Sequence, residues 1–372
     1  MLKIGITGQE GFVGKHLYNT IGLFPAEFER IDFKRSFFDI ENELDAFVSQ
    51  CDVIVHLAAL NRHNDPEVIY ATNVGLVKTI IASLERTGSK PQVIMSSSSQ
   101  EERDNLYGKS KKEGRELLVQ WANKASASFI GMVIPNVFGP FGHPYYNSVV
   151  ATFCHKLTHD ETPEIDVDGQ LRLIYVGELV EEILTLIRTK ASQALLPVSH
   201  TQEIKVSEIL ALLEGYKAQY LKLGIIPQLR NRFEVNLFNT FRCYMDIKNH
   251  FPVKYTQHPD HRGAFVEVIR LNVGGQVSFS TTVPGITRGN HFHTRKIERF
   301  SVIKGNALIQ LRQIGTAECM DFYLDGSAPA YVDMPVWYTH NIKNVGTEDL
   351  YTIFWINEFY DANNPDTFFE TV

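Results

Sequence analysis

The sequence predicts a doubly wound parallel α/β sheet followed by an all-β domain. In the first part of the chain, short apolar runs rich in β-branched residues alternate with segments of helical periodicity, as in parallel strands joined by helices. Beyond about residue 244, short runs rich in Val, Ile, Phe, Tyr and Thr follow one another with glycine or proline turns, which favours a sandwich or jelly roll. A chain of 372 residues has room for both, and we expect domains at residues 1–243 and 244–372.

The first twenty residues have the pattern of a dinucleotide-binding turn, which makes the first domain Rossmann-type. The apolar run 3–7 predicts a buried strand, and 15–21 has helical spacing. Between them, Gly8 permits a tight turn, Gly11 lets the backbone approach a pyrophosphate, and Gly14 lets the helix pack closely on the strand. The helix N-terminus would offer N–H donors to the phosphates. The residues expected to contact a cofactor here are Gly8, Gly11, Phe12, Val13 and Gly14.

The second expected strand, residues 27–32, carries the signal for the kind of cofactor. Asp32 at its end is the residue type that receives an adenosine ribose, whereas basic residues just beyond favour a 2′-phosphate. Lys34 and Arg35 are such residues, so we expect NADP(H) and place both in the cofactor site. The alternative is that Lys34 and Arg35 are only solvated loop charges.

The third and fourth expected strands both end in small side chains. The run 51–59 ends in Leu57, Ala58 and Ala59, where the backbone could lie against a cofactor. The run 92–96 leads into four serines, Ser96–Ser99. Parallel sheets bind ligands beyond the carboxyl ends of their strands, so the serine cluster lies at the edge where a site is expected.

A tyrosine and a lysine open the next expected helix. Tyr107 and Lys111 are four residues apart and share one helix face. An ammonium beside a phenol favours the phenolate, which would make Tyr107 a general acid for a carbonyl oxygen. A serine hydroxyl from the preceding strand could hold the same oxygen.

Residues 1 to about 241 resemble the extended short-chain dehydrogenases/reductases that act on nucleotide sugars. The resemblance implies hydride transfer from a nicotinamide, with Tyr107 as proton donor and Lys111 on the nicotinamide ribose. The serine of the triad would be Ser98, with Ser97 as the alternative. The matching pieces are the glycine turn, His56–Ala59, Asn73, the serine strand end, Tyr107-x-x-x-Lys111, Pro135–Gly139 and Ile174–Val180.

The same resemblance implies further ligand contacts. Asn73 would join the cofactor site. Asn136 and the stretch 142–147, with Asn147 at its end, lie where such enzymes grip the sugar nucleotide, although this stretch could equally be an ordinary loop.

The second domain contains a set of metal-ligand residue types. His291 and His293 point to the same face of an extended strand, and Glu298 on a returning strand and His340 on a neighbouring strand can meet them there. Three imidazoles and one carboxylate suit Zn²⁺ or another divalent transition metal. Both blocks resemble the two motifs of cupins, which implies a cupin jelly roll, but Trp337 stands where cupins usually have glycine.

Two further stretches of this domain resemble cupin epimerases of 4-keto deoxysugar nucleotides. They are residues 260–267 and 287–291, and the resemblance implies that Arg262 and Arg288 bind substrate. It also places the catalytic base at His291, which here would be a metal ligand as well. Either the metal activates the ketone as a Lewis acid or another residue is the base.

Nearly the whole chain resembles a family of bifunctional capsule and O-antigen enzymes that form UDP-2-acetamido-2,6-dideoxy-β-L-talose, on the route to UDP-N-acetyl-L-fucosamine. The resemblance implies C3 epimerisation of a UDP-linked 4-keto-6-deoxy-N-acetylhexosamine in the cupin domain, followed by NADPH-dependent C4 reduction. The C3 proton is acidic only while C4 is a ketone, so epimerisation must come first. The alternatives are a C4 reductase with a purely structural cupin and a non-catalytic NADP(H) or sugar-nucleotide sensor.

Composition limits which classes of binding partner and which cellular compartment we expect for this protein. A net charge of −7 without a Lys/Arg run makes nucleic acid an improbable partner. The four cysteines lie far apart, as reduced cytosolic thiols do. We see neither a signal peptide nor an apolar run of membrane-spanning length, and we expect a cytoplasmic homodimer.

Overall fold

The computed structural model describes residues 1–372 and divides into two compact units. The first unit comprises Met1–Val149 and Asp168–Val206, and the second comprises Val150–Val167 and Ser207–Val372. The chain therefore leaves the first unit and returns to it once before entering the second unit for the rest of its length.

The first unit is built on a six-stranded sheet whose strands all pair in parallel. The same unit also contains a small, separate three-stranded sheet. The main sheet has the order β2 (Phe28–Ile31), β1 (Leu2–Thr7), β3 (Val53–His56), β4 (Gln92–Ser98), β5 (Phe129–Ile134) and β8 (Gln193–Pro197); the small sheet has β6 (Asn136–Phe138), β7 (Gln170–Tyr175) and β9 (Gln202–Lys205).

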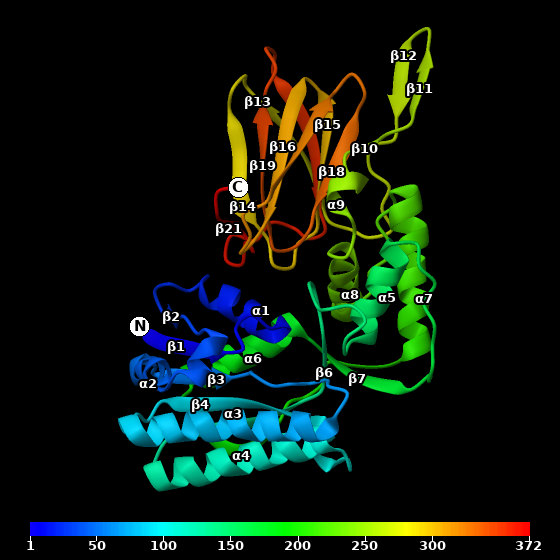
Figure 1. The fold of residues 1–372 in the computed structure, drawn as a ribbon. Coiled ribbons are helices and arrows are strands. Elements are labelled where there is room, and N and C mark those ends of the chain that lie inside the picture. Colours follow the sequence, from blue (N-terminus) through cyan, green and yellow to red (C-terminus); the bar gives the residue numbers. More distant parts are fainter. The chain divides into compact units, whose positions relative to one another are not determined.

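Helices cover both faces of this main sheet, as Figure 1 shows. One apolar core joins it to α1 (Phe12–Ile21) and α6 (Val176–Arg188). The other core joins it to α2 (Glu41–Gln50), α3 (Pro66–Thr87) and α4 (Leu106–Ala125). Successive side chains of a strand point to opposite faces, so the continuous apolar strands fill both cores. The predicted doubly wound parallel fold is confirmed. Two short 3₁₀ helices complete the unit, η1 (Arg35–Asp39) and η2 (Ser99–Glu102).

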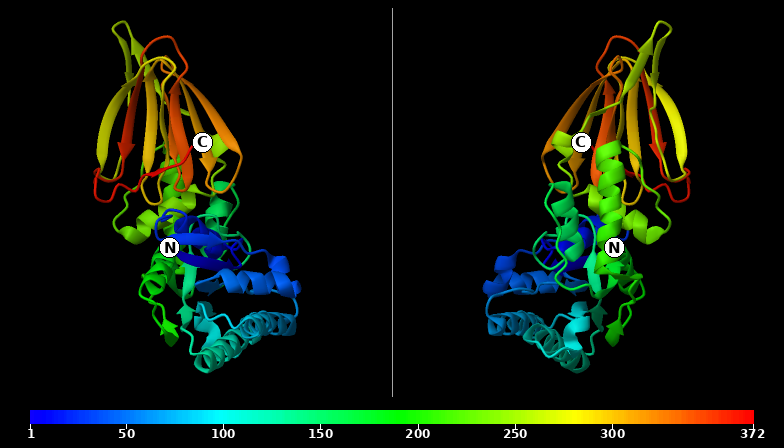
Figure 2. Two further views of the ribbon diagram at one scale, coloured as in Figure 1. Left: turned by 90° about the vertical axis from the view of Figure 1, so that its left-hand side faces the viewer. Right: turned by 90° about the vertical axis from the view of Figure 1, so that its right-hand side faces the viewer.

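The second unit contains a sandwich of two antiparallel five-stranded sheets (Figure 2), which confirms the predicted all-β fold. A separate hairpin, β11–β12, reaches beyond the sandwich (Figures 1 and 2). One sheet has the order β10 (Val253–Lys254), β18 (Ala330–Met334), β15 (Glu298–Lys304), β20 (Leu350–Ile356) and β13 (Gln276–Thr282); the other has β17 (Cys319–Asp325), β16 (Asn306–Gln313), β19 (Tyr338–Asn344), β14 (Thr287–Phe292) and β21 (Phe368–Phe369); the hairpin is β11 (Gln257–Asp260) and β12 (Gly263–Val266).

The division between the units differs from the predicted boundary at residues 243 and 244. Helices that we assigned to the first domain belong to the compact unit of the sandwich, and residues of two of them share a buried polar network with it. Tyr220 donates to Asp333 of β18 (2.7 Å), which is also paired with Arg299 of β15 (2.7 Å), and Arg242 donates to the Met334 carbonyl (2.8 Å). The helical elements concerned are α5 (Val149–Thr158), α7 (Val206–Tyr216), η3 (Lys217–Leu221) and α8 (Arg232–Arg242); α9 (Ile247–His250) also belongs to this unit and lies in the predicted second domain.

One helix, α3, has the length and mean hydropathy of a membrane span, contrary to the expectation from the sequence. A core helix meets the same two conditions, and one such helix is weak evidence for a span. Here Val77, Ile80 and Leu84 of α3 are buried in the core that α3 shares with the sheet.

Candidate functional site

The glycine turn after β1 has the geometry that close approach of a phosphate requires. Gly8 has a φ of 78°, in the left-handed region that favours glycine, and a Cβ there would lie 2.8 Å from the Ala58 nitrogen. A Cβ on Gly14 would lie 2.2 Å from the Gly8 carbonyl oxygen. Gly11 is the N-cap of α1 and offers no side chain to its first N–H groups. The N-terminus of α1 is therefore available to an anion.

Beyond β2, the acidic and basic residues have different surroundings. The Asp32 carboxylate accepts a hydrogen bond from the Tyr18 hydroxyl (2.6 Å). Lys34 and Arg35 are exposed and form no ion pair with an acidic side chain. Their charges are consequently free to meet a ligand phosphate.

The predicted cofactor residue Asn73 is buried and organises the loop after β3. Its amide accepts from the Leu60 N–H (2.7 Å) and donates to the Leu60 carbonyl (3.1 Å). It also donates to the Ser110 hydroxyl on α4 (3.1 Å). Asn73 thus holds the loop that follows Leu57, Ala58 and Ala59.

The two serine candidates have different partners. The Ser98 hydroxyl is hydrogen-bonded to the Tyr107 phenol. Ser97 points to the other side of β4 and donates a hydrogen bond to Glu101. Lys111 is buried and donates to Ser96 (3.5 Å). The predicted residues Ser98, Tyr107 and Lys111 therefore gather at the carboxyl end of β4 and the start of α4.

Burial dominates the pKa values of this group. It raises the pKa of the Tyr107 phenol; the Ser98 hydroxyl lowers that pKa in part, and Tyr146 raises it. Burial lowers the pKa of Lys111 to about 8, and the negative charge of Glu101 opposes this shift. We expected Lys111 to lower the pKa of Tyr107, but the net shift is upward because the phenol loses its hydration. A phenol that stays protonated suits a proton donor.

Two residues beside this group were missed by sequence reasoning. The Glu101 carboxylate forms a bidentate ion pair with Arg115 (2.9 and 2.8 Å), and both side chains are largely buried. This pair ties η2 to α4 across the short connection between Ser98 and Tyr107. The available signal was helical spacing, because Arg115 follows Lys111 by four residues on the face that begins with Tyr107.

The predicted sugar-nucleotide residues Asn136 and Asn147 are exposed. Asn136 begins β6, and Asn147 ends the loop 142–147. Arg62 donates to the Tyr145 and Tyr146 carbonyls of this loop (3.1 and 3.2 Å). The loop is thereby attached to the segment after β3, within the same unit as Tyr107.

In the second unit the four predicted metal ligands come together. Candidate ligand atoms of His291, His293, Glu298 and His340 all lie within 4.8 Å of one another. Buried Glu298 Oε2 is 3.1 Å from His293 Nε2 and 3.2 Å from His340 Nε2, yet none of these three atoms makes a hydrogen bond of good geometry. Buried polar atoms without partners that converge on one point are what a metal centre requires, so the residues fit a divalent transition metal.

Electrostatics at this cluster also favours a cation. Burial and the neighbouring His340 lower the pKa of His291 to about 4, which keeps its imidazole neutral. Burial alone would raise the pKa of Glu298, but His293 and His340 hold it well below its usual range. Burial alone would lower the pKa of His293, but the Glu298 carboxylate raises it. The ionised carboxylate therefore favours a positive charge at this point, which a metal ion would supply.

Trp337, whose backbone is hydrogen-bonded to that of the cluster residue His293, adopts the left-handed backbone conformation. Its φ is 63°, and its N–H donates to the His293 carbonyl (2.8 Å). The backbone position that cupins usually fill with glycine therefore keeps the glycine conformation here despite the large side chain.

The two predicted substrate arginines are not brought to the cluster. Arg262 lies in the turn of the β11–β12 hairpin and pairs with Asp260 (2.6 Å). Arg288 on β14 is exposed and donates to the Thr282 hydroxyl (3.0 Å) and the Thr281 carbonyl (3.1 Å).

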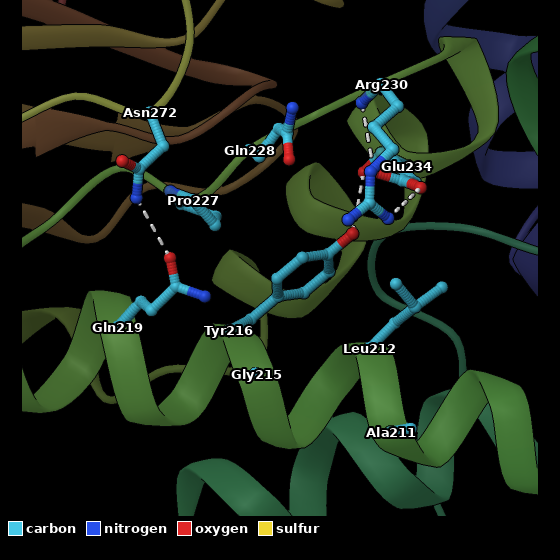
Figure 3. A pocket seen from close by; sticks show the side chains of 10 residues that line it. All are labelled: Ala211, Leu212, Gly215, Tyr216, Gln219, Pro227, Gln228, Arg230, Glu234 and Asn272. Carbon is cyan, nitrogen blue, oxygen red and sulfur yellow. Dashed lines mark hydrogen bonds and ion pairs between the residues drawn. The ribbon is translucent and has the colours of Figure 1, made fainter.

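A pocket of about 400 Å³ in the second unit contains none of the predicted residues (Figure 3). The Arg230 and Glu234 side chains approach each other at one end (3.4 Å), and Asn272 donates to Gln219 at the other (3.1 Å). Most of its polar side chains are hydrogen-bonded to one another, and we assign the pocket no function. The lining residues are Ala211, Leu212, Gly215, Tyr216, Gln219, Pro227, Gln228, Arg230, Glu234 and Asn272.

The fold and these two sites define a nucleotide-cofactor-binding α/β domain joined to a cupin-type sandwich. The chain belongs to the NAD dependent epimerase/dehydratase family, whose model matches residues 4–195. A second model, the polysaccharide biosynthesis C-terminal domain, matches residues 258–368.

Full-length relatives share both parts. The chain is 32% identical over 373 residues to UDP-2-acetamido-2,6-beta-L-arabino-hexul-4-ose reductase of Pseudomonas aeruginosa, covering 99% of this chain and 98% of the relative. It is 35% identical to the crystal structure of the capsular polysaccharide assembling protein CapF from Staphylococcus aureus, with a TM-score of 0.64 and coverage of 99% of this chain and 100% of that chain.

RMD from Pseudomonas aeruginosa, complexed with NADPH, is 20% identical over 59% of this chain and 83% of its own, with a TM-score of 0.54, and shows the fold alone.

Proposed function

We propose that this chain is an NADPH-dependent reductase that acts on C4 of a UDP-linked 4-keto-6-deoxy-N-acetylhexosamine. The observation that carries the proposal is the grouping of Ser98, Tyr107 and Lys111 at the same edge of the parallel sheet as the glycine turn, in a chain whose full-length relative is named a hexul-4-ose reductase. We propose further that the cupin domain epimerises C3 before the reduction, on the route to UDP-N-acetyl-L-fucosamine.

In the reduction, bound NADPH would supply a hydride to C4. Tyr107 would donate the phenolic proton to the C4 oxygen, and Ser98 would hold that oxygen by a hydrogen bond. Lys111 would bind the nicotinamide ribose, and its ammonium would stabilise the phenolate that remains after proton transfer.

In the epimerisation, a divalent metal such as Zn²⁺ would be held by His291, His293, Glu298 and His340 and would supply Lewis acidity. A base would take the C3 proton and leave an enolate, and a proton donor on the opposite face would return a proton to C3. Because His291 would be a metal ligand, the base would be another residue.

The decisive experiment is incubation of the full chain with the UDP-4-keto sugar and NADPH. We expect the absorbance of NADPH to fall and NMR of the product to show a C4 hydroxyl with inverted C3. Absence of NADPH oxidation would instead favour the sensor. Reduction without inversion would leave a C4 reductase with a structural cupin. The cytoplasmic location and the homodimer stay predictions.

Removal of the two basic residues beyond β2 should weaken the preference for NADPH. Each charge-assisted contact to a 2′-phosphate contributes ~1.5–3 kcal/mol, or about 10–100-fold in affinity. We expect Lys34→Ala/Arg35→Ala to raise KM for NADPH by at least about tenfold with little change for NADH. Steady-state kinetics with both cofactors measures this. Equal kcat/KM for the two cofactors in the unmodified protein would contradict the assignment.

Glu101→Gln should shift the pH profile of the reductase. Lys111 acts as an ammonium, so activity falls as pH rises through its pKa of about 8. Without the negative charge of Glu101 this pKa decreases further, so the basic limb of kcat/KM should move to lower pH by roughly one unit.

The matched control for Glu101→Gln is Asp45→Asn. Asp45 likewise accepts from a serine, Ser83 (2.6 Å), and from an arginine, Arg86 (2.6 and 2.9 Å), on the helices α2 and α3. Asp45→Asn should leave the pH profile unchanged. An identical profile in both variants would show that Glu101 has no influence on Lys111.

A further inference from the structure

The C-terminal segment of the chain reaches the loop that carries the metal ligand His293, and it does so through Asp366. This aspartate is buried, with 4% of its surface exposed. Its carboxylate accepts hydrogen bonds from three successive backbone N–H groups, those of Thr294 (3.1 Å), Arg295 (3.0 Å) and Lys296 (3.0 Å). The Thr294 hydroxyl donates to it as well (2.7 Å).

Successive N–H groups that point to one side form a concave anion site, and a carboxylate is the natural partner for it. The three donors follow His293 directly and have no partner in a strand. Asp366 therefore satisfies the backbone of the turn between β14 and β15, the two strands that carry His291 and Glu298. Lys296 adds a bond from its ammonium to the Pro365 carbonyl (2.6 Å).

The backbone carbonyl of the same residue contacts the metal ligand itself. It accepts a hydrogen bond from Nδ1 of His293. A carbonyl cannot donate, so Nδ1 must carry the proton, which makes Nε2 available to a metal. Nε2 is the buried atom that faces Glu298 without a good hydrogen bond.

Asp366 adopts an uncommon backbone conformation that brings both contacts about. Its φ is 43°, in the left-handed region, where aspartate and asparagine are among the better tolerated residues. This conformation lets one residue direct its side chain to residues 294–296 and its carbonyl to His293. The carboxylate thus holds the carbonyl in place.

We infer that Asp366 is a positioning residue of the metal centre, which sets the tautomer and orientation of His293 from the C-terminal segment. The inference rests on the metal site of the proposed function. Hydrogen-bond partners behind metal-binding histidines typically change metal affinity about 10–100-fold when they are removed.

The test is Asp366→Asn in the full chain, since asparagine keeps the left-handed backbone and the side-chain size. We expect Zn²⁺ affinity, measured by competition with a fluorescent chelator, to fall about 10–100-fold. In the metal-free protein at alkaline pH, ¹⁵N NMR of His293 should show the Nδ1–H tautomer, with the Nε2–H tautomer gaining population in the variant.

The matched control is Asp325→Asn. The Asp325 carboxylate also accepts from a backbone N–H in a turn, that of Ser327 (2.8 Å), in the same unit. This control should bind Zn²⁺ as the unmodified protein does. Thr294→Val removes only the hydroxyl bond to Asp366 and should weaken Zn²⁺ binding in the same direction by a smaller factor, which preserves the test if Asp366→Asn does not fold.

Unchanged Zn²⁺ affinity and an unchanged His293 tautomer in folded Asp366→Asn would overturn the inference alone. Failure of the unmodified protein to bind Zn²⁺ or Co²⁺ would overturn the metal site and the inference together. Neither result would affect NADPH oxidation by the first unit, so the reductase proposal is judged separately.

Discussion

Tyr107→Phe is expected to lower NADPH-dependent reduction of the keto sugar by about 10²–10⁴-fold, the usual contribution of a general acid. The substitution removes one hydroxyl from a half-buried ring, and we expect the packing of α4 to stay unchanged. NADPH binding should change little, because the glycine turn, Lys34 and Arg35 are untouched. Exchange of the C3 proton with solvent deuterium should persist, since it needs only the ketone and the second unit.

Stopped-flow and steady-state measurement of NADPH oxidation, with NMR of C3 deuteration in parallel, would test this expectation. Tyr70→Phe is the control: it also deletes a phenolic hydroxyl in the first unit, one that donates to Glu113 on α4. A near-normal rate of NADPH oxidation by Tyr107→Phe would contradict the assignment of Tyr107 as the proton donor. Equal loss in both variants would point to damage of the helix pair α3 and α4.

Glu298→Gln should remove the bound metal and slow C3 exchange by about 100-fold or more. The carboxylate is the one anionic ligand, and its replacement by an amide of similar volume leaves three neutral imidazoles. A Lewis acid contributes several kcal/mol to a developing enolate, and ~2.7 kcal/mol corresponds to about 100-fold in rate. Elemental analysis and deuterium incorporation at C3 without NADPH give the two readouts.

His258→Ala, in the exposed β11–β12 hairpin of the same unit, should retain both metal and exchange. His340→Gln serves as a second ligand variant. If either ligand variant loses its metal yet exchanges C3 at the normal rate, the metal is structural. A chain truncated near Phe241 would be a poorer test of the cupin domain. The truncation removes Arg242 and the sandwich, and it leaves Tyr220 without its buried partner Asp333.

Several features of this protein could be predicted from the sequence because local patterns determine them. Alternating apolar and helical segments predict the parallel sheet, and the spacing of Gly8, Gly11 and Gly14 predicts the turn before α1. The interval between Tyr107 and Lys111 predicts a shared helix face. The residue types at positions 291, 293, 298 and 340 predict the cluster, since strand geometry brings alternate residues to one face.

Other features were decided only by the tertiary structure, because they depend on contacts between segments distant in the chain. Ser98 rather than Ser97 meets Tyr107 because of the direction of β4 relative to α4. The Glu101–Arg115 pair and the upward shift of the Tyr107 pKa depend on the burial of these side chains by the folded chain. The helical elements that carry Tyr220 and Arg242 lie with the sandwich because both side chains satisfy buried groups of β18. Asp366 meets His293 although 73 positions separate them, and no local periodicity records such a contact.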